Sequence, residues 1–487
     1  MDARDGQRAD LPRAVGRTAP DLQASPLIPE SKDGRRAEPD GFDALYPRLR
    51  SSSDLDGIER LGDPLVLAEA LPPARLFAVL RFLLSEAHDL ASSRRLAALH
   101  RRWGDWVQSA AQDPLPPPGP RRPSGRLRIG LLSSDLRRHP VGAHVLPLLR
   151  HYDRGRLEFV AFSPTLSPGD PVQAEIREHV AAFEVIGGLG PREAAARVRE
   201  AGVDILLELN GLTPGSRIDA LAWRAAPLQI EWLGYQFTTG LAAVDHFLLD
   251  RWNTPSAPGL LHEPVLTMPE SWVCFAGEAE PAPSPVPPSR ANGFVTFGTL
   301  AHPFKVTRRA FAVWAKVLAA VPDARFLIVR PEAGDADFRA HVMAAFAREG
   351  AEPGRIDFFD NAAAGVSHLS CYDRIDIALD TAPVTGGTTT CEGLWMGVPT
   401  VTLVGESLHQ RLSRSLLSGV GLERLCAATV DDYVRIAAGL AADGKSLARL
   451  RRGLRARIID SALGDGRRFA RAFETVMFEA ARRRGLA

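Results

Sequence analysis

The sequence predicts an α/β protein with two Rossmann-like halves that face each other across a cleft, preceded by a short helical segment. Short apolar runs such as RLRIGLL and FVTFGTL alternate with amphipathic runs such as PREAAARVREAG, which is typical of a parallel sheet covered by helices. This alternation stops at a proline-rich stretch, residues 280–293, and then starts again. A chain of 487 residues is also too long for one hydrophobic core.

Four parts follow one another along the chain. Residues 1–41 are polar, charged and proline-punctuated, and we expect a disordered tail there. Residues 42–123 carry apolar residues at three- and four-residue spacing and end in the linker DPLPPPGPRRPSG, so we expect helices and then a boundary. No intact repeat of about 34 residues is found in them. Residues 124–280 and 281–487 are the predicted N-terminal and C-terminal halves.

The predicted elements of the two halves can be named by their sequences. In the first half we expect strands in RLRIGLL, LEFVAF, DILLEL, PLQIEW and VDHFLLD, with PREAAARVREAG as a helix. In the second half we expect strands in FVTFGTL, ARFLIVR, IDFF, IDIALD and PTVTLV. Its predicted helices are TRRAFAVWAKVLAAV, DFRAHVMAAFAREG, SLHQRLSRSLLSGVG and the region from Asp431 onward. Whether the last helix returns to the first half is left open.

Composition excludes several functional classes. The chain has 59 basic and 58 acidic residues, so its net charge of +1 gives no reason to expect a nucleic acid partner. Its four cysteines form no Cys-x-x-Cys pair, which argues against a disulfide framework and a structural zinc site. The N-terminus has no apolar secretory segment, and no apolar run is long enough for a membrane span. We therefore expect a cytoplasmic protein.

The stretch DTAPVTGGTTTCEG follows a predicted strand at Asp380 and enters a predicted helix. Ligands of open parallel sheets bind beyond the carboxyl ends of the strands, and the N–H groups of a helix N-terminus suit phosphate. The glycines allow close backbone approach, the threonine hydroxyls can donate to phosphate, and the glutamate can accept from a ribose hydroxyl. A helix cap with a capping box explains the same pattern, and both interpretations stay open. The candidate donor-binding residues here are Gly386, Gly387, Thr388, Thr389, Thr390 and Glu392.

Two loops of the first half carry further candidates. His139 and His144 follow the first strand of this half, at the mouth of the predicted cleft, where a histidine can act as a general base. The alternative is a histidine that caps a helix or bonds to its own loop. GYQFTTG also follows a strand and predicts a tight loop at the same sheet edge. Its candidate cleft residues are Gly234, Tyr235, Thr238, Thr239 and Gly240.

The second half adds Lys305 and His368. Lys305 comes shortly after the first strand of this half, and a lysine beside a diphosphate would neutralise the charge of the leaving group. A surface lysine is the ordinary alternative. His368 precedes the strand that leads to Asp380, and its ordinary interpretation is a solvated helix residue.

Two common catalytic signatures are missing. The chain has no G-x-S-x-G elbow and no G-x-G-x-x-G motif opening the first half, which argues against an α/β-hydrolase and a conventional dehydrogenase. The candidate loops carry many donors and few clustered carboxylates. We therefore expect transfer of a diphosphate-activated group without a metal ion or other cofactor.

Five segments together resemble the O-linked N-acetylglucosamine transferase family, which includes the SPINDLY-type O-fucosyltransferases. These segments are RLRIGLLSSDLRRHPVGAH, DILLELNGLTPGSRIDALAWRAAPLQIEWLGYQFTTG, VTFGTLAHPFKVT, ALDTAPVTGGTTTCEGLWMGVPTVTLVGE and RLSRSLLSGVGLERL. They occur in the family's order and cover about residues 124 to 480. Five collinear segments make the resemblance far more specific than any single motif.

The resemblance implies a GT-B fold, with the nucleotide sugar mainly on the second half. It implies an inverting, metal-independent transfer to serine or threonine hydroxyls of a protein acceptor. Lys305 matches a lysine at the donor diphosphate, and Glu392 matches the acidic residue that holds the ribose. Thr388 and Thr389 match the threonines at the phosphates. His139 matches the histidine of an HP motif near the catalytic centre, and His368 matches a histidine near the nucleotide base.

Two departures leave the donor open between UDP-N-acetylglucosamine and GDP-fucose. Gly387 stands where family members that use UDP-N-acetylglucosamine carry a histidine, and Glu392 stands where they carry an aspartate. GTTTCEG is similar to the SPINDLY-type pattern, whose donor is GDP-fucose, whereas the histidine of RRHPVGAH is typical of the N-acetylglucosaminyl branch. The family's long tetratricopeptide array is not found, so the acceptor is open. Rival interpretations are a sugar-nucleotide epimerase and a catalytically silent nucleotide-sugar-binding protein.

Overall fold

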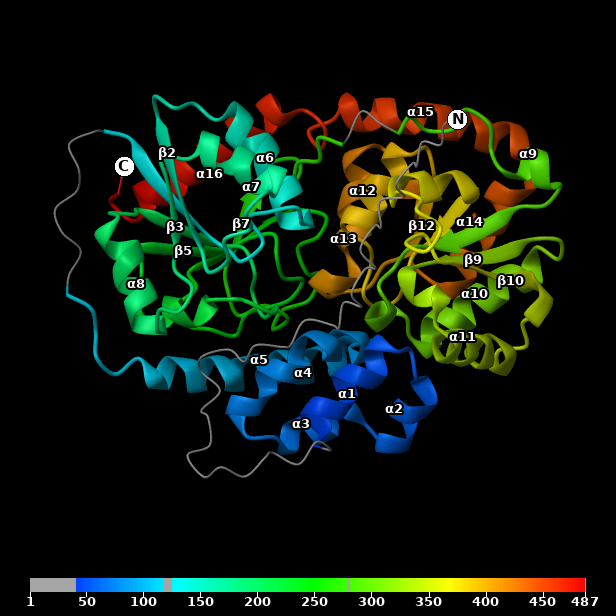
Figure 1. Cartoon of the computed structure of the whole chain (residues 1–487), viewed down its shortest axis with the longest axis horizontal. Helices are drawn as coiled ribbons and strands as arrows, with labels where there is room; N and C mark the ends of the chain where they lie inside the picture. The colour runs from blue at the N-terminus through cyan, green and yellow to red at the C-terminus, as the bar shows by residue number, and fades with distance from the viewer. Residues whose placement is uncertain (1–40, 117–124, 278–280, 487) are drawn as a thin grey trace, which may run out of the picture.

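The computed structural model describes residues 41–116, 125–277 and 281–486. Its elements form three parts: a helical part and two halves, each built on a sheet (Figure 1). The predicted tail at 1–41, apart from residue 41, and most of the proline-rich linker lie outside the described residues. No described helix is long and apolar enough to cross a membrane.

The helical part has five helices whose starts are fixed largely by aspartate caps. They are α1 (Phe42–Ser51), α2 (Leu55–Leu61), α3 (Pro64–Ala70), α4 (Pro73–Leu83) and α5 (Leu90–Ala110). Asp54, Asp63 and Asp89 accept backbone N–H groups at the starts of α2, α3 and α5. The apolar faces of α4 and α5 pack together and bury Leu80, Leu83 and other side chains.

The first half is built on a parallel sheet in the order β3-β2-β1-β4-β5-β6-β7. The strands are β1 (Leu127–Leu132), β2 (Leu157–Ser163), β3 (Ala182–Val185), β4 (Ile205–Glu208), β5 (Leu228–Glu231), β6 (His246–Asp250) and β7 (Val265–Met268). Its helices are α6 (Pro140–His151), α7 (Pro171–His179) and α8 (Pro191–Glu200). In register, Ile129 of β1 pairs with Phe159 of β2 on one side and Ile205 of β4 on the other.

The second half repeats this plan in the order β10-β9-β8-β11-β12-β13, again parallel. The strands are β8 (Thr296–Thr299), β9 (Arg325–Val329), β10 (Ile356–Phe359), β11 (Ile377–Leu379), β12 (Thr400–Leu403) and β13 (Cys426–Ala427). The helices are α9 (Ser289–Asn292), α10 (Arg308–Ala320), α11 (Ala336–Arg348), α12 (Thr388–Trp395), α13 (Leu412–Gly419), α14 (Val430–Ala442), α15 (Gly444–Ile459) and α16 (Gly466–Arg483).

Both sheets reverse their strand order at one point, between β1 and β4 and between β8 and β11. In a doubly wound fold, the loops that leave such a pair of strands part to opposite faces and open a crevice for a ligand. The loops after β1, β4, β8 and β11 are therefore the places to look for a site. They include the loops that carry His139, Lys305 and Thr388.

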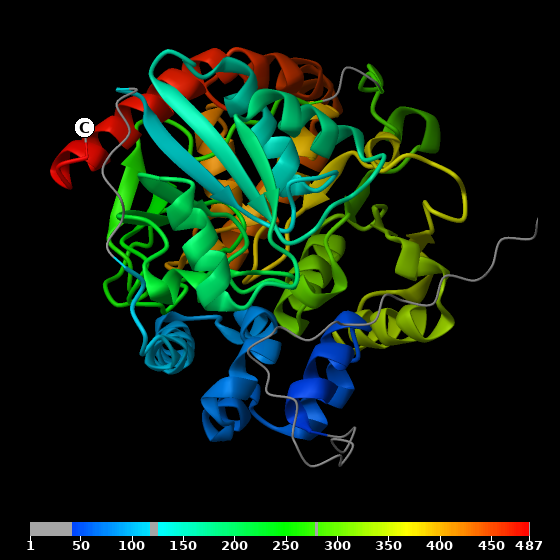
Figure 2. The same cartoon turned by 60° about the vertical axis from the view of Figure 1, so that its left-hand side comes forward.

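The last helix, α16, leaves the second half and packs against α6 of the first (Figure 2). Phe473 of α16 contacts the ring of Trp232, with centroids 5.6 Å apart, and Glu474 accepts the N–H of Asp153 at 2.7 Å. This answers the question that the sequence left open. It also means that part of the predicted C-terminal half, residues 281–487, belongs structurally to the first half.

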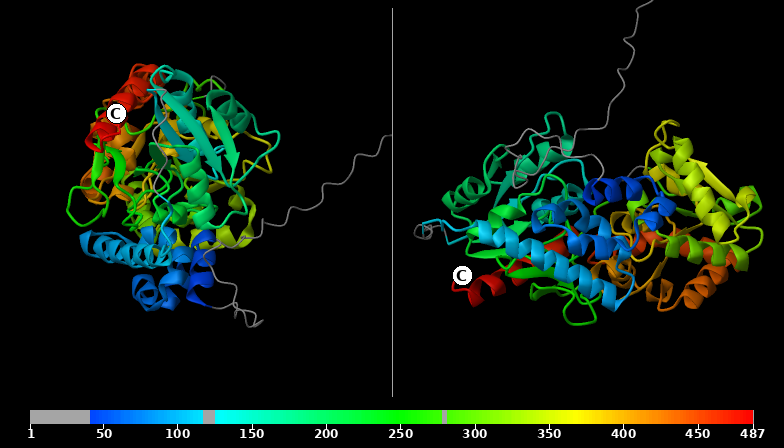
Figure 3. Two further views of the ribbon diagram at one scale, coloured as in Figure 1. Left: turned by 90° about the vertical axis from the view of Figure 1, so that its left-hand side faces the viewer. Right: turned by 90° about the horizontal axis from the view of Figure 1, so that it is seen from below.

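The helical part lies across both halves, with α5 beneath the first half (Figure 3). Arg50 of α1 donates to the carbonyl of Val306 in the second half at 3.2 Å. On the other side, α5 approaches the first half so closely that a Cβ on Gly104 would lie 2.1 Å from the carbonyl oxygen of Gly240. Gly240 also has a φ of +72°, which favours glycine. Both glycines are needed for this contact.

The strands and helices named from the sequence are present, and three strands and three helices were missed. The missed elements are β3, β7, β13, α6, α7 and α9. The three strands have four residues or fewer, which is too short for an alternating pattern to stand out. In α7, a nine-residue helix, only Gln173 and Ile176 are buried, so its apolar face is narrow.

Candidate functional site

A cavity of about 380 Å³ opens between the loops of the two halves, and the helical part closes one side of it. Its lining includes nine of the predicted residues: His139, His144, Gly234, Tyr235, Lys305, His368, Gly387, Thr388 and Thr389. Further polar and charged residues that line it are Arg81, Thr213, Gln236, Trp272, His302 and Arg330. Among the described residues, no aspartate or glutamate lines this cavity. It is therefore a site with an excess of hydrogen-bond donors.

Asp380, directly after β11, folds the loop that follows it. Its Oδ1 accepts the N–H groups of Thr381 and Gly386 at 2.9 and 2.8 Å, and its Oδ2 accepts the hydroxyls of Thr402 and Ser413 at 2.7 and 2.5 Å. Burial raises the pKa of Asp380, and these hydrogen bonds together with the charge of Lys305 oppose the rise. Sequence reasoning named the stretch and missed this carboxylate, which determines the loop's shape.

The N-terminus of α12 faces the cavity without a side-chain cap. Gly387 is the N-cap residue, and no side chain accepts the N–H groups of the first turn. The alternative interpretation as a threonine cap with a capping box is therefore wrong. Thr388 and Thr389 line the cavity, whereas Thr390 is buried and bonded to Ser413 at 2.9 Å. The first turn, which has no side-chain cap, and the hydroxyls of Thr388 and Thr389 suit a phosphate group.

Lys305 reaches the same loop from the other side of the β8–β11 switch point. It ends a short 3₁₀ turn, and its Nζ donates to the carbonyl of Thr385 at 3.1 Å. Burial lowers the pKa of Lys305, and the carboxylate of Asp380 opposes this. The ammonium group is thus placed beside the loop that leads into α12, and the contact with a diphosphate stays a prediction.

His144 connects the two halves across the cavity. On α6, its Nδ1 is 2.9 Å from the carbonyl oxygen of Cys274, and its Nε2 is 3.2 Å from Thr388 Oγ1 on α12. A carbonyl only accepts, so Nδ1 carries the proton and Nε2 accepts the hydroxyl proton of Thr388. Burial lowers the pKa of His144, which keeps this ring neutral. The sequence placed His144 in the acceptor loops; the structure places it against the donor loop.

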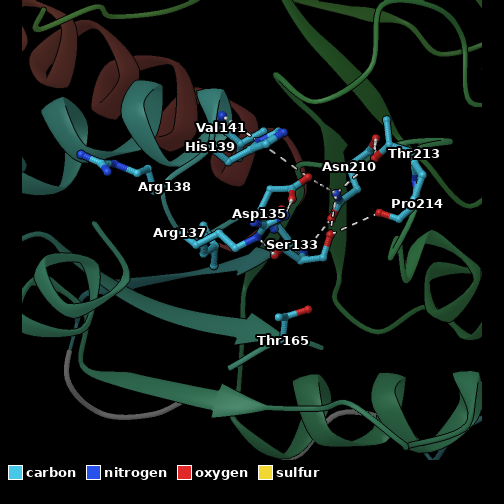
Figure 4. A network of polar contacts seen from close by, with 12 residues as sticks. Ser133, Asp135, Arg137, Arg138, His139, Val141, Thr165, Asn210, Thr213 and Pro214 are labelled. Atoms are coloured by element: carbon cyan, nitrogen blue, oxygen red, sulfur yellow. Dashed lines mark hydrogen bonds and ion pairs between the residues drawn. The ribbon is translucent and has the colours of Figure 1, made fainter. Parts of the chain in front are cut away.

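His139 caps α6, which was the alternative role considered for it. Its Nδ1 accepts the N–H of Val141 at 3.3 Å and lies 3.7 Å from Asp135 Oδ2 (Figure 4). With Nδ1 accepting, the proton of the neutral ring is on Nε2, the nitrogen left for the cavity. Burial lowers the pKa of His139, while Asp135 raises it. In this form His139 is a hydrogen-bond donor to a ligand.

A network behind His139 joins the loops of the β1–β4 switch point (Figure 4). Asn210, which follows β4, donates to Asp135 Oδ2 at 2.9 Å and to Thr213 Oγ1 at 3.2 Å, and its Oδ1 accepts the N–H of Ser134 at 2.8 Å. Neither Asp135 nor Asn210 was singled out from the sequence. The signal available was their position directly after two adjacent strands.

His368 and Glu392 form a pair at the rim of the donor loop. His368 Nε2 is 3.0 Å from Glu392 Oε2, and the hydroxyl of Tyr372 donates to the carbonyl of Thr389 at 2.9 Å. His368 lines the cavity and Glu392 stands behind it. Gly386 also stands behind the lining, where a Cβ would lie 2.4 Å from Thr390 Oγ1.

Some residues of the GYQFTTG loop line the cavity, and the others anchor the loop to the rest of the protein. Gly234 and Tyr235 line the cavity, and the hydroxyl of Tyr235 lies 2.8 Å from His100 Nε2 of α5. Thr238 and Thr239 are buried away from the cavity, and Thr238 donates to a carboxylate oxygen of Glu263 at 2.7 Å. Together with Gly240, which meets α5, they hold the loop against the rest of the protein and do not face the cavity.

Two spacings that match known ligand-binding motifs belong to helices and helix caps. G-x-x-x-x-G-K-S occurs at residues 439–446, but Gly439 lies inside α14 and Asp443 caps α15, so no strand precedes it as a phosphate-binding loop requires. Asp-x-Asp occurs at Asp54 and at Asp335, and both aspartates cap helices. Among the residues described, no three His, Cys, Asp or Glu side chains are grouped to hold a metal ion.

A pair of buried carboxyl groups lies behind the first-half loops. Glu208 and Glu231 are register partners at the ends of β4 and β5, and both are fully buried. Glu208 accepts the N–H of Asn210 at 3.2 Å and that of Gly211 at 2.5 Å, whereas no N–H or O–H group of the described residues donates to Glu231. Burial raises the pKa of both, that of Glu208 to about 7. Glu231 therefore keeps a proton and donates it to Glu208.

This shared proton predicts a pH-dependent stability. The folded pair holds protons that unfolded glutamates have lost. The stability that these protons contribute is complete below about pH 4.5 and decreases as the pH rises, and the part that Glu208 contributes is lost as the pH passes through about 7. In Glu231→Gln, an amide replaces the protonated carboxyl and donates to Glu208 at every pH. The difference in unfolding free energy between this variant and the wild type should therefore shift in favour of the variant, by on the order of 2 kcal/mol, as the pH rises from about 5 to about 7.5.

Urea titration at several pH values measures this difference. The exposed Glu352→Gln is the matched control and should follow the wild type. Parallel pH curves for Glu231→Gln and the wild type would show that the pair does not share a proton.

A cavity between the switch points of two Rossmann-like halves, with a lysine and an open helix N-terminus on one side, is the arrangement of the GT-B fold. Residues 106–273 and 288–473 match the family model Glycosyl transferase family 41. The chain belongs to this family, and the fold expected from the sequence is confirmed.

Relatives and a solved structure agree with this assignment. The chain is 34% identical over 410 residues to a Hordeum vulgare protein named "Probable UDP-N-acetylglucosamine--peptide N-acetylglucosaminyltransferase SPINDLY", covering 83% of this chain and 43% of that one. An Arabidopsis thaliana protein of the same name is 33% identical, over 78% and 42% of the two chains. An O-GlcNAc transferase variant from Thermobaculum terrenum superposes with a TM-score of 0.77 at 29% identity, covering 91% and 84%. The chain thus spans less than half the length of these two curated relatives.

Proposed function

We propose that this chain is an inverting, metal-independent protein O-glycosyltransferase. It would transfer a sugar to serine or threonine hydroxyls of a protein. The first candidate for this sugar is N-acetylglucosamine, with UDP-N-acetylglucosamine as the donor. The observation that carries the proposal is the cavity that brings Lys305, Thr388 and Thr389 of the second half opposite His139 of the first. The names of the relatives support the same donor and a peptide acceptor, and that of the T. terrenum structure supports transfer of the same sugar.

In this proposal the second half holds the donor. The N-terminus of α12 and the hydroxyls of Thr388 and Thr389 would bind the diphosphate, and Lys305 would neutralise its charge as the bond to the sugar breaks. Glu392 and His368, which pair at the rim, would hold the ribose and the base. The predicted role of Gly386 and Gly387 is to let the backbone approach the phosphates.

The first half would hold the acceptor. The acceptor oxygen forms its bond to the anomeric carbon on the face opposite the departing diphosphate, so the configuration inverts. His139, with its proton on Nε2, can donate to a substrate oxygen and position it, and Asp135 and Asn210 fix the loop behind it. Because no carboxylate of the described residues lines the cavity, the hydroxyl proton would leave to water or to a phosphate oxygen of the donor.

O-fucosyl transfer from GDP-fucose is the second candidate, because the run from Thr388 to Glu392 is similar to the SPINDLY-type pattern and Gly387 stands in place of the histidine of the N-acetylglucosaminyl branch. Purified protein incubated with a cell lysate and labelled UDP-N-acetylglucosamine, UDP-glucose or GDP-fucose separates the candidates. We expect label on protein from one donor, and that donor alone should raise the melting temperature.

Each other outcome of this assay has a distinct meaning. Conversion of the free nucleotide sugar without labelled protein would indicate an epimerase. Binding without turnover would indicate a silent binding protein, and neither binding nor turnover would contradict the proposal. His139→Asn in the same assay tests the positioning role, which undiminished transfer would remove.

A further inference from the structure

Arg81 is a charged group of the cavity that the donor chemistry above does not use. It lies in the last turn of α4, so it comes from the helical part and not from either half. Arg81 and Leu84 are the residues that this part contributes to the cavity lining. Its guanidinium lies over the ring of Phe82, 4.2 Å from the centroid.

The guanidinium has no polar partner. Among the described residues, no hydrogen bond or ion pair is formed by Arg81, although the groups around it are well paired. Arg330, the other arginine of the cavity, is bonded to both carboxylate oxygens of Glu332 at 3.0 Å, and Lys305 is held by Thr385. Burial lowers the pKa of Arg81, as expected for a cation removed from water without a counter-ion.

The backbone that carries Arg81 is held rigidly. Phe82 packs edge-on against Phe304, with centroids 5.9 Å apart, and Ser85 donates to the carbonyl of Phe304 at 2.6 Å. A little further on, the carbonyl of Ala87 accepts from Gln410 at 2.8 Å. Arg81 is therefore presented at a fixed place in the cavity.

We propose that Arg81 binds a carboxylate of the acceptor and selects acceptor segments that carry an aspartate or glutamate near the modified hydroxyl. The inference deepens the proposed function and rests on it. A guanidinium matches a carboxylate with two parallel hydrogen bonds, and no carboxylate of the described residues in the cavity lining competes for Arg81. The carboxylate of the acceptor would then be the counter-ion of Arg81.

The position of Arg81 favours the acceptor over the donor as the source of this anion. The charge of the donor diphosphate is met by Lys305 and the N-terminus of α12, both on the second half. Arg81 itself comes from neither half, and its charge is within range both of Tyr235, which belongs to the predicted acceptor loops, and of His302 of the second half.

A positional library of serine-centred peptides, with Asp, Ala or Lys fixed in turn at each flanking position, tests the proposal. With the donor that supports transfer, we expect the wild type to prefer Asp over Ala at one or more positions by about tenfold to a hundredfold, the effect of one hydrogen bond to a charged group. Arg81→Gln should lose this preference, Arg81→Lys should regain part of it, and Arg81→Glu should prefer Lys. The exposed Arg435→Gln is the matched control and should behave as the wild type.

Donor affinity and melting temperature are measured for the same variants. Donor affinity should match the wild type, and the melting temperature should stay close to it, because Arg81 has no hydrogen bond or ion pair to lose and only its contact with the ring of Phe82 changes. No acidic preference in the wild type, or a preference that survives in Arg81→Gln, would overturn the inference. Weaker donor binding with every peptide would assign Arg81 to the donor phosphates and overturn it as well.

Fluorescence polarisation of the labelled peptides, without donor, separates this inference from the proposed function. If acidic peptides bind through Arg81 and no donor is turned over, the inference stands and the transferase proposal fails.

Discussion

Lys305→Ala is expected to lower the turnover of sugar transfer by at least about a hundredfold while the protein stays folded. Lys305 is the ammonium group at the donor loop, and removing one preorganised group that stabilises developing negative charge costs this much in other enzymes. Its loss removes one hydrogen bond, to the carbonyl of Thr385, so the cost in stability is small. Initial rates at saturating donor and acceptor measure the effect.

The exposed Lys316→Ala on α10 is the matched control and should keep full activity. Donor affinity, measured separately, distinguishes a charge that acts on the departing diphosphate from one that only binds it. An unchanged turnover in Lys305→Ala would remove Lys305 from the proposed chemistry.

Asp380→Ala is expected to destabilise the protein by about 3 to 5 kcal/mol and to weaken donor binding. The carboxylate accepts from two backbone N–H groups and two hydroxyls, and its removal leaves these buried donors unsatisfied. The loop that leads into α12 loses the bond to Gly386 that sets its direction. Urea unfolding gives the free energy, and a thermal-shift titration gives the donor affinity.

Asp380→Asn is the informative control. Its Oδ1 can still accept from Thr381 and Gly386, and its amide can donate to the hydroxyl oxygens of Thr402 and Ser413. We therefore expect this variant to stay close to the wild type in stability. Equal losses in both variants would mean that the charge of Asp380, rather than its hydrogen bonds, holds the loop.

Much of the site could be predicted because parallel sheets collect their functional loops at one edge. Lys305, His139 and Thr388 each follow a strand closely in the sequence, and the strand order then brings them to one cavity. What could not be predicted is which side chains of neighbouring residues face the cavity and which face the core. Thr390 turns into the core because it lies one or two positions further around α12 than the two threonines that face the cavity.

The missed residues depend on contacts between distant parts of the chain. Arg81 lies on a helix more than two hundred residues from Lys305, and the packing of the helical part on the second half, at Phe304 among other contacts, brings both to one cavity. The partner of Glu208 follows from strand register, which the sequence does not specify for two short buried strands.

The contact between His144 and Thr388 has a consequence for donor affinity. A threonine hydroxyl has a single proton, and here His144 Nε2 accepts it, because the other ring nitrogen donates to Cys274. A phosphate oxygen at the same place needs that proton and would otherwise meet only the lone pairs of Thr388. The histidine and the donor thus compete for one hydrogen, and the affinity of the proposed site for its donor is reduced by the free energy of breaking the link that joins the two halves.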